Sequence, residues 1–252
     1  MPIHFLTYII VGTAVFIAGF VDAIAGGGGL ISLPVYMMVG LPAHNAIATN
    51  KMSSTCGTAL STVRFIKNGL IHMKLALPSV FLAIIGSTIG AHLALMTNND
   101  ILEKIMIPIL PITALFVFNK HLFHDHHHAF KITRRTMLVS LLAAFIVGIY
   151  DGFYGPGTGT FLLIILTIFG RMAIKHANGQ VKAINLTTNI SALTVYLFNG
   201  QVIIGLGLFA ALCNMAGNYL GSGMMMSKGS KVVKPVIGVV LVMLLLKMVH
   251  VY

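Results

Sequence analysis

Two carboxylates, each followed by a run of glycines, interrupt apolar segments of this chain and limit what it can fold into. The first motif reads Asp-Ala-Ile-Ala-Gly-Gly-Gly-Gly over residues 22–29, and the second reads Asp-Gly-Phe-Tyr-Gly-Pro-Gly-Thr-Gly over 151–159. Inside a bilayer an ionisable side chain is costly, and non-helical backbone survives only where protein buries it or it lines a wet cavity. Both motifs therefore indicate a built site in a membrane protein.

The composition excludes a water-soluble fold. With 57% hydrophobic residues, 8% charged residues and a mean hydropathy of +0.94, the chain cannot cover a water-facing surface with polar groups. Its 252 residues suit one helical bundle with no separate soluble domain. The net charge of +11 lies in short links between apolar runs, where it sets membrane orientation. We therefore expect membrane lipid, and no nucleic acid, as a partner.

The apolar segments fall into two similar sets. The longest polar link divides the chain into a first transmembrane repeat, 1–119, a histidine-rich cytoplasmic link, 120–135, and a second transmembrane repeat, 136–252. The apolar stretches lie at 5–21, 29–40, 46–66, 73–96, 101–119, 136–150, 158–170, 177–199, 202–226 and 233–251.

The two halves also match residue by residue, which indicates an internal duplication. A shift of 129 residues aligns the acid-plus-glycine motifs, and a shift of 131 aligns the segments that follow. Matched glycines are common in membrane proteins, but a matched acid and a matched lysine are not. The matches are Asp22 with Asp151, Gly26 with Gly155, Gly28 with Gly157, and Lys51 with Lys182.

Positive charge indicates how the two halves are oriented. Lys51 and Lys182, as possible core residues, and Lys247, near the terminus, are left out of this comparison. If each glycine-broken pair of segments is one crossing, the remaining basic residues divide 7 to 6 between the two sides; if each pair is a hairpin, twelve lie on one side against Lys104 on the other. The positive-inside rule favours the hairpins. We predict an all-α polytopic bundle of two inverted repeats, each a Gly-broken helical hairpin plus three transmembrane helices, with both termini outside the cytoplasm. The number of segments that cross the membrane fully, eight or ten, stays open.

The two motif carboxylates, Asp22 and Asp151, are candidates for proton coupling. A carboxyl group in a low-dielectric interior can take up and release a proton near neutral pH. Alternatively, each carboxylate caps the half-helix after the break or ties its glycine loop through backbone N–H groups. The two roles are compatible.

The glycine runs and the segments after them supply candidates for binding an anion. Backbone N–H groups that converge at a half-helix start form an anion site without side-chain charge, whereas close helix packing is the alternative explanation for the glycines. A lysine followed by amide and hydroxyl side chains could hold an oxyanion. Alternatively, the lysine extends to the membrane interface and the polar side chains form hydrogen bonds between helices. The predicted substrate-binding residues are Gly26, Gly27, Gly28, Gly29, Asn50, Lys51, Gly155, Gly157, Lys182 and Asn185.

A histidine-rich tract lies in the link between the halves. Its histidines, from His121 to His128, have no fixed spacing on a predicted element, so a solvated cytoplasmic loop explains them better than a structural metal site. Cys56 and Cys213 lie far apart in apolar segments and suggest no disulfide or metal ligand set. We expect no bound metal and no cofactor.

The doubled motif resembles the sulfite exporter TauE/SafE family. The resemblance rests on residues 22–29 with Leu33-Pro34 following, on Ala48-Thr-Asn50-Lys51, and on residues 151–159, and it covers nearly the whole chain. It implies a multi-pass permease of the cell inner membrane that moves small sulfur-containing oxyanions such as sulfite or organosulfonates. The resemblance assigns no binding-residue set, so the site residues rest on the physical argument above.

The sequence thus predicts a secondary transporter and not an enzyme. Two half-helix N-termini with Lys51 and Lys182 would hold the anion, and one repeat would rock against the other. The rival functions are an anion channel, an intramembrane enzyme using Asp22 and Asp151 as an aspartyl dyad, and a structural subunit of a larger assembly. A homodimer is compatible with all of them.

Overall fold

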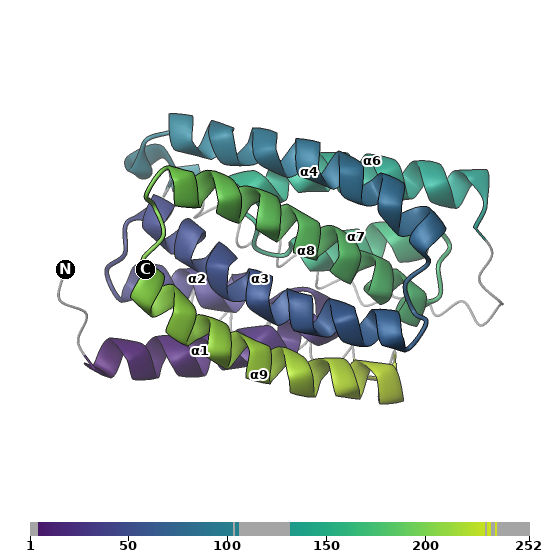
Figure 1. Ribbon diagram of the computed structural model, residues 1–252, viewed down its shortest axis with the longest axis horizontal. Helices are drawn as coiled ribbons and strands as arrows, with labels where there is room; N and C mark the ends of the chain where they lie inside the picture. The colour runs from purple at the N-terminus through teal and green to yellow at the C-terminus, as the bar shows by residue number, and fades with distance from the viewer. Residues whose placement is uncertain (1–4, 103, 106–131, 230, 233–234, 236–252) are drawn as a thin grey trace.

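The computed structural model describes residues 5–102, 104–105, 132–229, 231–232 and 235 (Figure 1). This part of the chain is helical and contains no strand, which confirms the predicted all-α class. The histidine tract lies outside the described residues, as do almost all of the predicted segments 101–119 and 233–251. The helices are α1 (Phe5–Ala25), α2 (Gly29–Met38), α3 (Ala43–Lys67), α4 (Met73–Met96), α6 (Arg134–Phe153), α7 (Thr158–Ile168), α8 (Ile174–Phe198) and α9 (Ile204–Lys228).

The long helices end where the sequence supplies a suitable cap. Gly69 after α3 and Gly200 after α8 both have φ of +65°, in the left-handed region. Each lies in the turn that ends its helix. The N–H of Leu70 binds the carbonyl of Phe65, and the N–H of Gln201 binds that of Tyr196. This arrangement is a Schellman cap, which needs a left-handed residue that glycine adopts without strain. The 131-residue shift also matches Gly69 with Gly200, and the two glycines therefore have the same structural role.

Two helix pairs bring the halves together through backbone contact. In one pair α9 packs on α1, and in the other α4 packs on α6. A Cβ atom at Gly217 would lie 2.0 Å from the carbonyl oxygen of Phe16, and one at Gly86 would lie 2.3 Å from that of Phe145. Small residues allow membrane helices to approach this closely. The two contacts are the same contact with the halves exchanged.

We expect Gly217→Val to lower the free energy of unfolding by about 1–3 kcal/mol, because the added side chain overlaps the backbone of α1. Gly86→Val should have an effect of similar size at the matching contact. The midpoint of thermal unfolding in detergent measures both. Gly205→Ala is the control, since the nearest atom to its new Cβ lies 3.9 Å away. A Gly217→Val variant as stable as the wild type would contradict the close packing.

Apart from the α1–α2 and α6–α7 turns, the helix connections lie at the two ends of the bundle (Figure 1). At one end, Arg135 in the first turn of α6 binds the carbonyl of Phe169, and Lys175 in α8 binds that of Met226. At the other end, Asn45 in α3 binds the carbonyl of Gln201, and the ring of His44 contacts the carbonyl of Ala94 and the side chain of Asn99. Helix α3 therefore runs from the second end to the first, while its counterpart α8 runs the opposite way.

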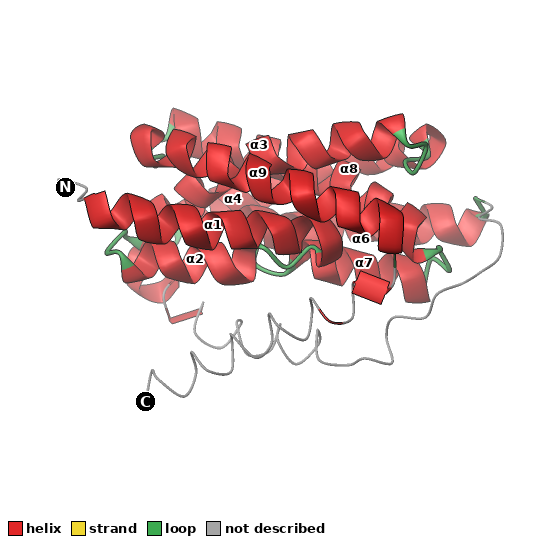
Figure 2. Ribbon diagram, turned by 90° about the horizontal axis from the view of Figure 1, so that it is seen from below, coloured by secondary structure: helices red, strands yellow, loops and turns green. Residues whose placement is uncertain are grey.

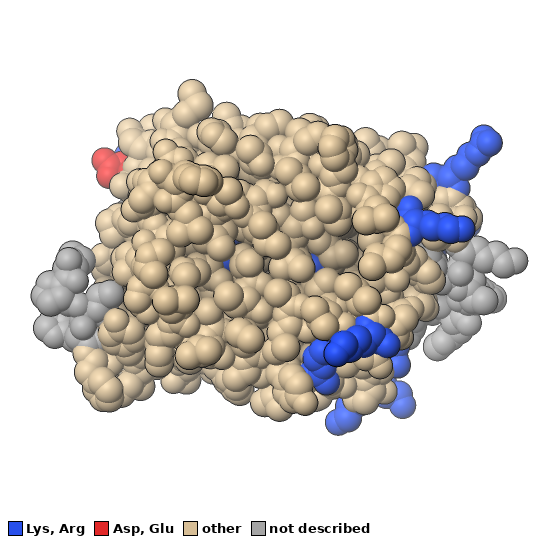
Figure 3. Space-filling model, viewed as in Figure 1, with Lys and Arg blue, Asp and Glu red and all other residues tan. Residues whose placement is uncertain are grey.

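Basic side chains mark the first of these ends. Figure 3 shows Lys and Arg side chains gathered at the end that lies to the right in Figure 1. His72 lies at this end, 4.8 Å from His176 between ring centroids. Burial, and next the charge of His176, hold the pKa of His72 below its ordinary value. His72 therefore adds no positive charge there at neutral pH.

The polar helices lie inside an apolar shell. Within the described residues, four helices are long and apolar enough to cross a membrane, namely α1, α4, α6 and α9. Helices α3 and α8 are less apolar and pack against each other, with α9 on α3 and α4 on α8. Most of their polar side chains are buried, including those of Thr49, Asn50, Lys51, Ser53, Asn178, Gln180, Lys182 and Asn185. This arrangement keeps charged and amide groups away from lipid.

Candidate functional site

The first glycine run makes a sharp turn inside the bundle. Helix α1 continues past Asp22 to Ala25, and Gly26 follows with φ of +77°. The chain then returns along α1, because a Cβ atom at Gly28 would lie 2.5 Å from the carbonyl oxygen of Ala18. Glycine is required at both positions, first for its left-handed conformation and then for the close approach. Helices α1 and α2 thus form a broken hairpin whose turn lies in the middle of the bundle (Figure 2).

The carbonyl end of α1 is satisfied by side chains of the second half. The last four carbonyls of a helix have no intrahelical partner, and inside a membrane no bulk water replaces one. Here α7 and α8 supply the donors. Lys182 binds the carbonyl of Asp22, Asn178 binds those of Ala23 and Ile24, and Thr160 binds that of Ala25. The broken helix therefore depends on the other half for its stability.

The second glycine run turns in the same way and touches the first. Gly155 and Gly157 have φ of +97° and +84°, and α7 begins directly after them. A Cβ atom at Gly26 would lie 2.3 Å from the carbonyl carbon of Gly159, and one at Gly29 would lie 3.1 Å from Cα of Pro156. The two turns are therefore in backbone contact. The N-terminal ends of the half-helices α2 and α7 meet at this contact.

Two buried ion pairs cross between the halves at the same place. Lys51 Nζ lies 2.6 Å from Asp151 Oδ2, and Lys182 Nζ lies 2.8 Å from Asp22 Oδ2. The lysines are matched residues of the two repeats, and so are the aspartates. Each lysine therefore pairs with the aspartate of the opposite half. These two pairs are the side-chain salt bridges found among the described residues.

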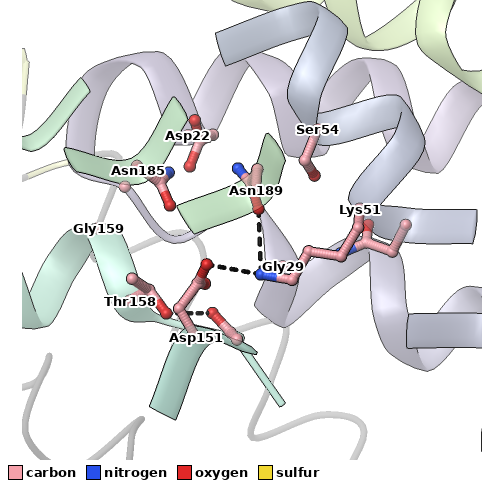
Figure 4. Close-up of a pocket in the computed structure, with 12 residues that line it drawn as sticks. Asp22, Gly29, Lys51, Ser54, Asp151, Thr158, Gly159, Asn185 and Asn189 are labelled. Atoms are coloured by element: carbon pink, nitrogen blue, oxygen red, sulfur yellow. Dashed lines mark hydrogen bonds and ion pairs between the residues drawn. The ribbon is translucent and has the colours of Figure 1, made fainter. Parts of the chain in front are cut away.

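The two pairs differ in how completely they are enclosed. Lys51 also donates to Asn189 Oδ1 at 3.0 Å, so its ammonium points between two side chains of the second half (Figure 4). The side chains of Lys51 and Asp151 are each 3% exposed. Lys182 is 0% exposed, but the Asp22 side chain retains 14% exposure. Asp22 is thus the more accessible carboxylate.

A small cavity lies between the turns and the ion pairs. It offers about 20 Å³ to the centre of a water molecule, and a site needs only about 10–15 Å³ to hold one water. The cavity therefore has room for about one water and none for a larger ligand. Both halves line it, through Asp22, Gly26, Gly29, Asn50, Lys51, Ser54, Asp151, Gly155, Thr158, Gly159, Asn185 and Asn189.

The predicted site residues gather around this cavity. Asp22, Asp151, Lys51, Asn50, Asn185 and three of the six glycines line it. Lys182 lies behind Asp22, which it binds, and Asn50 accepts a hydrogen bond from Ser32 at 2.6 Å. Gly27, Gly28 and Gly157 shape the turns without lining the cavity.

The sequence analysis did not select four of the lining residues. Ser54 and Asn185 are matched under the 131-residue shift, and Asn189 follows Asn185 by one helical turn. These spacings place all three on the faces of α3 and α8 that carry the lysines. Thr158 and Gly159 belong to the second glycine motif itself. Helical periodicity was therefore the signal for Ser54 and Asn189, and the glycine motif was the signal for Thr158 and Gly159.

The fold and the site together define a class of protein. A helical membrane bundle in which two discontinuous helices meet at a polar cavity is an architecture found in membrane transporters. The chain belongs to the sulfite exporter TauE/SafE family, whose sequence profile matches residues 11–248. It is a multi-pass protein of the inner membrane, as predicted.

Named relatives cover almost the same length. A probable membrane transporter protein, ORF9, from Sinorhizobium sp. is 32% identical over 98% of this chain and 94% of its own. A probable membrane transporter protein from Haemophilus influenzae is 32% identical over 93% and 91%, and YfcA of Escherichia coli K12 is 30% identical over 93% and 86%. These names describe transporters rather than enzymes. No solved structure matches the chain significantly.

Proposed function

We propose that this chain is a secondary transporter of small sulfur-containing oxyanions such as sulfite or organosulfonates. One observation carries the proposal: the two glycine turns, the N-terminal ends of α2 and α7 and the two lysine–aspartate pairs surround one cavity. Helix N-termini and ammonium groups both attract oxyanions. The family's description as sulfite exporters supports the choice of sulfur oxyanions.

The ion pairs suggest how the anion enters. In the described state the carboxylates of Asp22 and Asp151 occupy the ammonium groups that an oxyanion would need. An arriving oxyanion takes the place of a carboxylate, which then accepts a proton or turns away. Because each pair joins the two halves, exchange of partners also loosens their contact. Substrate binding and movement of one half against the other are thereby linked.

The orientation in the membrane follows from the same proposal. We take the two halves to be inverted repeats, with the end that holds Arg135 and Lys175 in the cytoplasm. The opposite directions of α3 and α8 support this arrangement. Transport then consists of one repeat rocking against the other, so that the cavity opens to each side in turn. A homodimer is compatible with this arrangement.

The rival functions fit the site less well. An aspartyl enzyme needs two carboxylates that share a proton and hold a water between them. Here each carboxylate is instead bound to a lysine. An anion channel needs no carboxylates beside its cations, and its flux would show neither saturation nor counter-ion coupling.

Flux measurements in liposomes test the proposal. The purified protein should take up radiolabelled sulfite or methanesulfonate with saturation. Lys51→Ala and Lys182→Ala should each reduce uptake to background, because each removes one of the two buried cations of the site. Lys67→Ala is the matched control, since this lysine lies exposed at the end of α3. Uptake at the wild-type rate by both site variants would rule out the cationic site.

A further inference from the structure

We propose that only the Lys182–Asp22 pair opens during transport, and that Asp22 takes up one proton for each singly charged oxyanion that binds. Transport is then electroneutral and driven by a pH gradient. This inference rests on the proposed function, and it assigns different tasks to two residues that the duplication makes equivalent. The Lys51–Asp151 pair stays closed as the tie between the halves.

The first argument is the difference in anchoring. Lys51 is held by two side chains of the second half, Asp151 at 2.6 Å and Asn189 at 3.0 Å. Among the described residues, the ammonium of Lys182 is held by one residue, Asp22, through the carboxylate and the carbonyl of that residue. The counterpart of Asn189 in the first half is Thr58, whose buried hydroxyl has no hydrogen-bond partner among the described residues. The amide that secures Lys51 therefore has no equivalent beside Lys182.

The second argument is access. Asp22 lines the cavity and its side chain is 14% exposed, whereas Asp151 is 3% exposed. Asp22 also covers Lys182, which is fully buried behind it. A proton that reaches the cavity therefore meets Asp22 more readily than Asp151. Once its carboxylate is neutral, Asp22 releases its hold on Lys182 and uncovers a positive charge.

The charged groups that face Asp22 come from three helices. They are Lys182 of α8, Lys51 of α3, whose charge interacts with that of Asp22, and Asp151 at the end of α6. Helices α2 and α7 contain no charged residue, and the one in α9, Lys228, lies at its far end. A proton that arrives at Asp22 therefore meets these three charged partners and no others on the described helices packed around it.

The third argument is the charge of the site. When empty it holds two lysines and two aspartates, so its net charge is zero. Adding one anion to this enclosed region leaves an uncompensated buried charge, which is strongly unfavourable. One proton on Asp22 restores neutrality, because the freed ammonium of Lys182 then balances the anion. A doubly charged anion such as sulfate would also require the more tightly held pair to open.

The proton follows a closed cycle. It enters from the aqueous side to which the cavity is open and binds Asp22 Oδ2, while the anion binds beside the freed Lys182. After the cavity opens to the other side, both leave and the Lys182–Asp22 pair forms again. One proton and one anion thus move together in the same direction, and the protein ends in its starting state.

Accumulation in liposomes under two separate driving forces tests the coupling. A pH gradient of one unit should drive about tenfold accumulation of radiolabelled methanesulfonate by the wild type. A potential of about 60 mV, positive inside, would drive the same accumulation only if one net charge moved, and we expect no response to it. Sulfate should not accumulate.

Asp22→Asn and its matched control Asp151→Asn locate the proton. Asp22→Asn removes one negative charge, so it should exchange methanesulfonate for methanesulfonate, ignore the pH gradient and respond to the potential. Asp151→Asn should transport more slowly but keep the pH-driven accumulation. The reverse pattern, or a wild type that follows the potential, would overturn the inference while leaving the transport function intact. No methanesulfonate flux under any gradient would refute the proposed function and this inference with it.

Discussion

Replacing Lys51 by methionine should lower the free energy of unfolding by about 3–5 kcal/mol, because it leaves Asp151 buried and unpaired. Asp151 is 3% exposed, so little water can replace the ammonium. Lys182→Met removes the matched cation but should have a smaller effect, since Asp22 retains 14% exposure toward the cavity. Unfolding by denaturant in detergent measures the difference between the two variants.

A double variant separates the loss of the pair from the stranded charge. Lys51→Met combined with Asp151→Asn leaves no unpaired charge, and replacing a buried ion pair by neutral groups is often close to neutral for stability. The double variant should therefore recover most of the stability lost in Lys51→Met. A double variant less stable than Lys51→Met alone would show that the pair contributes more than mutual neutralisation.

Joining the two glycine turns by a disulfide should stop transport. A Cβ atom at Gly27 would lie 3.4 Å from Oγ1 of Thr160, which is within reach of a disulfide between cysteines at these positions. The cavity of about 20 Å³ is too small for an oxyanion with four heavy atoms. The turns must therefore separate for substrate to bind. Oxidised Gly27→Cys/Thr160→Cys protein should show background flux, and reduction should restore it.

This experiment requires a background without the native cysteines, Cys56 and Cys213, which are both free thiols. The single variants Gly27→Cys and Thr160→Cys serve as controls under the same oxidant. Each should transport equally before and after oxidation. Full flux in the oxidised double variant would mean that the two turns stay together during transport, and rocking of one repeat against the other would be wrong.

The sequence located the helices well, because apolar runs and glycine caps are local signals. Residues 73–96 were predicted as one apolar segment and form helix α4 with the same bounds. Helix α1 is longer than its apolar stretch, since it continues through Asp22 to Ala25. Periodicity alone could not show this, because the helical carboxylate is acceptable only with Lys182 beside it.

The pairing of charges could not be predicted from the duplication. Matching Lys51 with Lys182 and Asp22 with Asp151 leaves two arrangements, with each lysine bound to the aspartate of its own half or of the other. The choice depends on how α1 packs against α8 and α6 against α3, which is a long-range property. The inverted orientation, the roles of the site residues and the homodimer stay predictions.

The crossed pairs also affect how the protein is made. During synthesis the first half enters the membrane before the second, so Asp22 and Lys51 arrive without the partners that they have in the folded protein. Until the second half follows, these two residues have only each other or trapped water to offset their charge. We therefore expect the first half alone to be unstable in the membrane, and insertion of the second half completes both ion pairs at once.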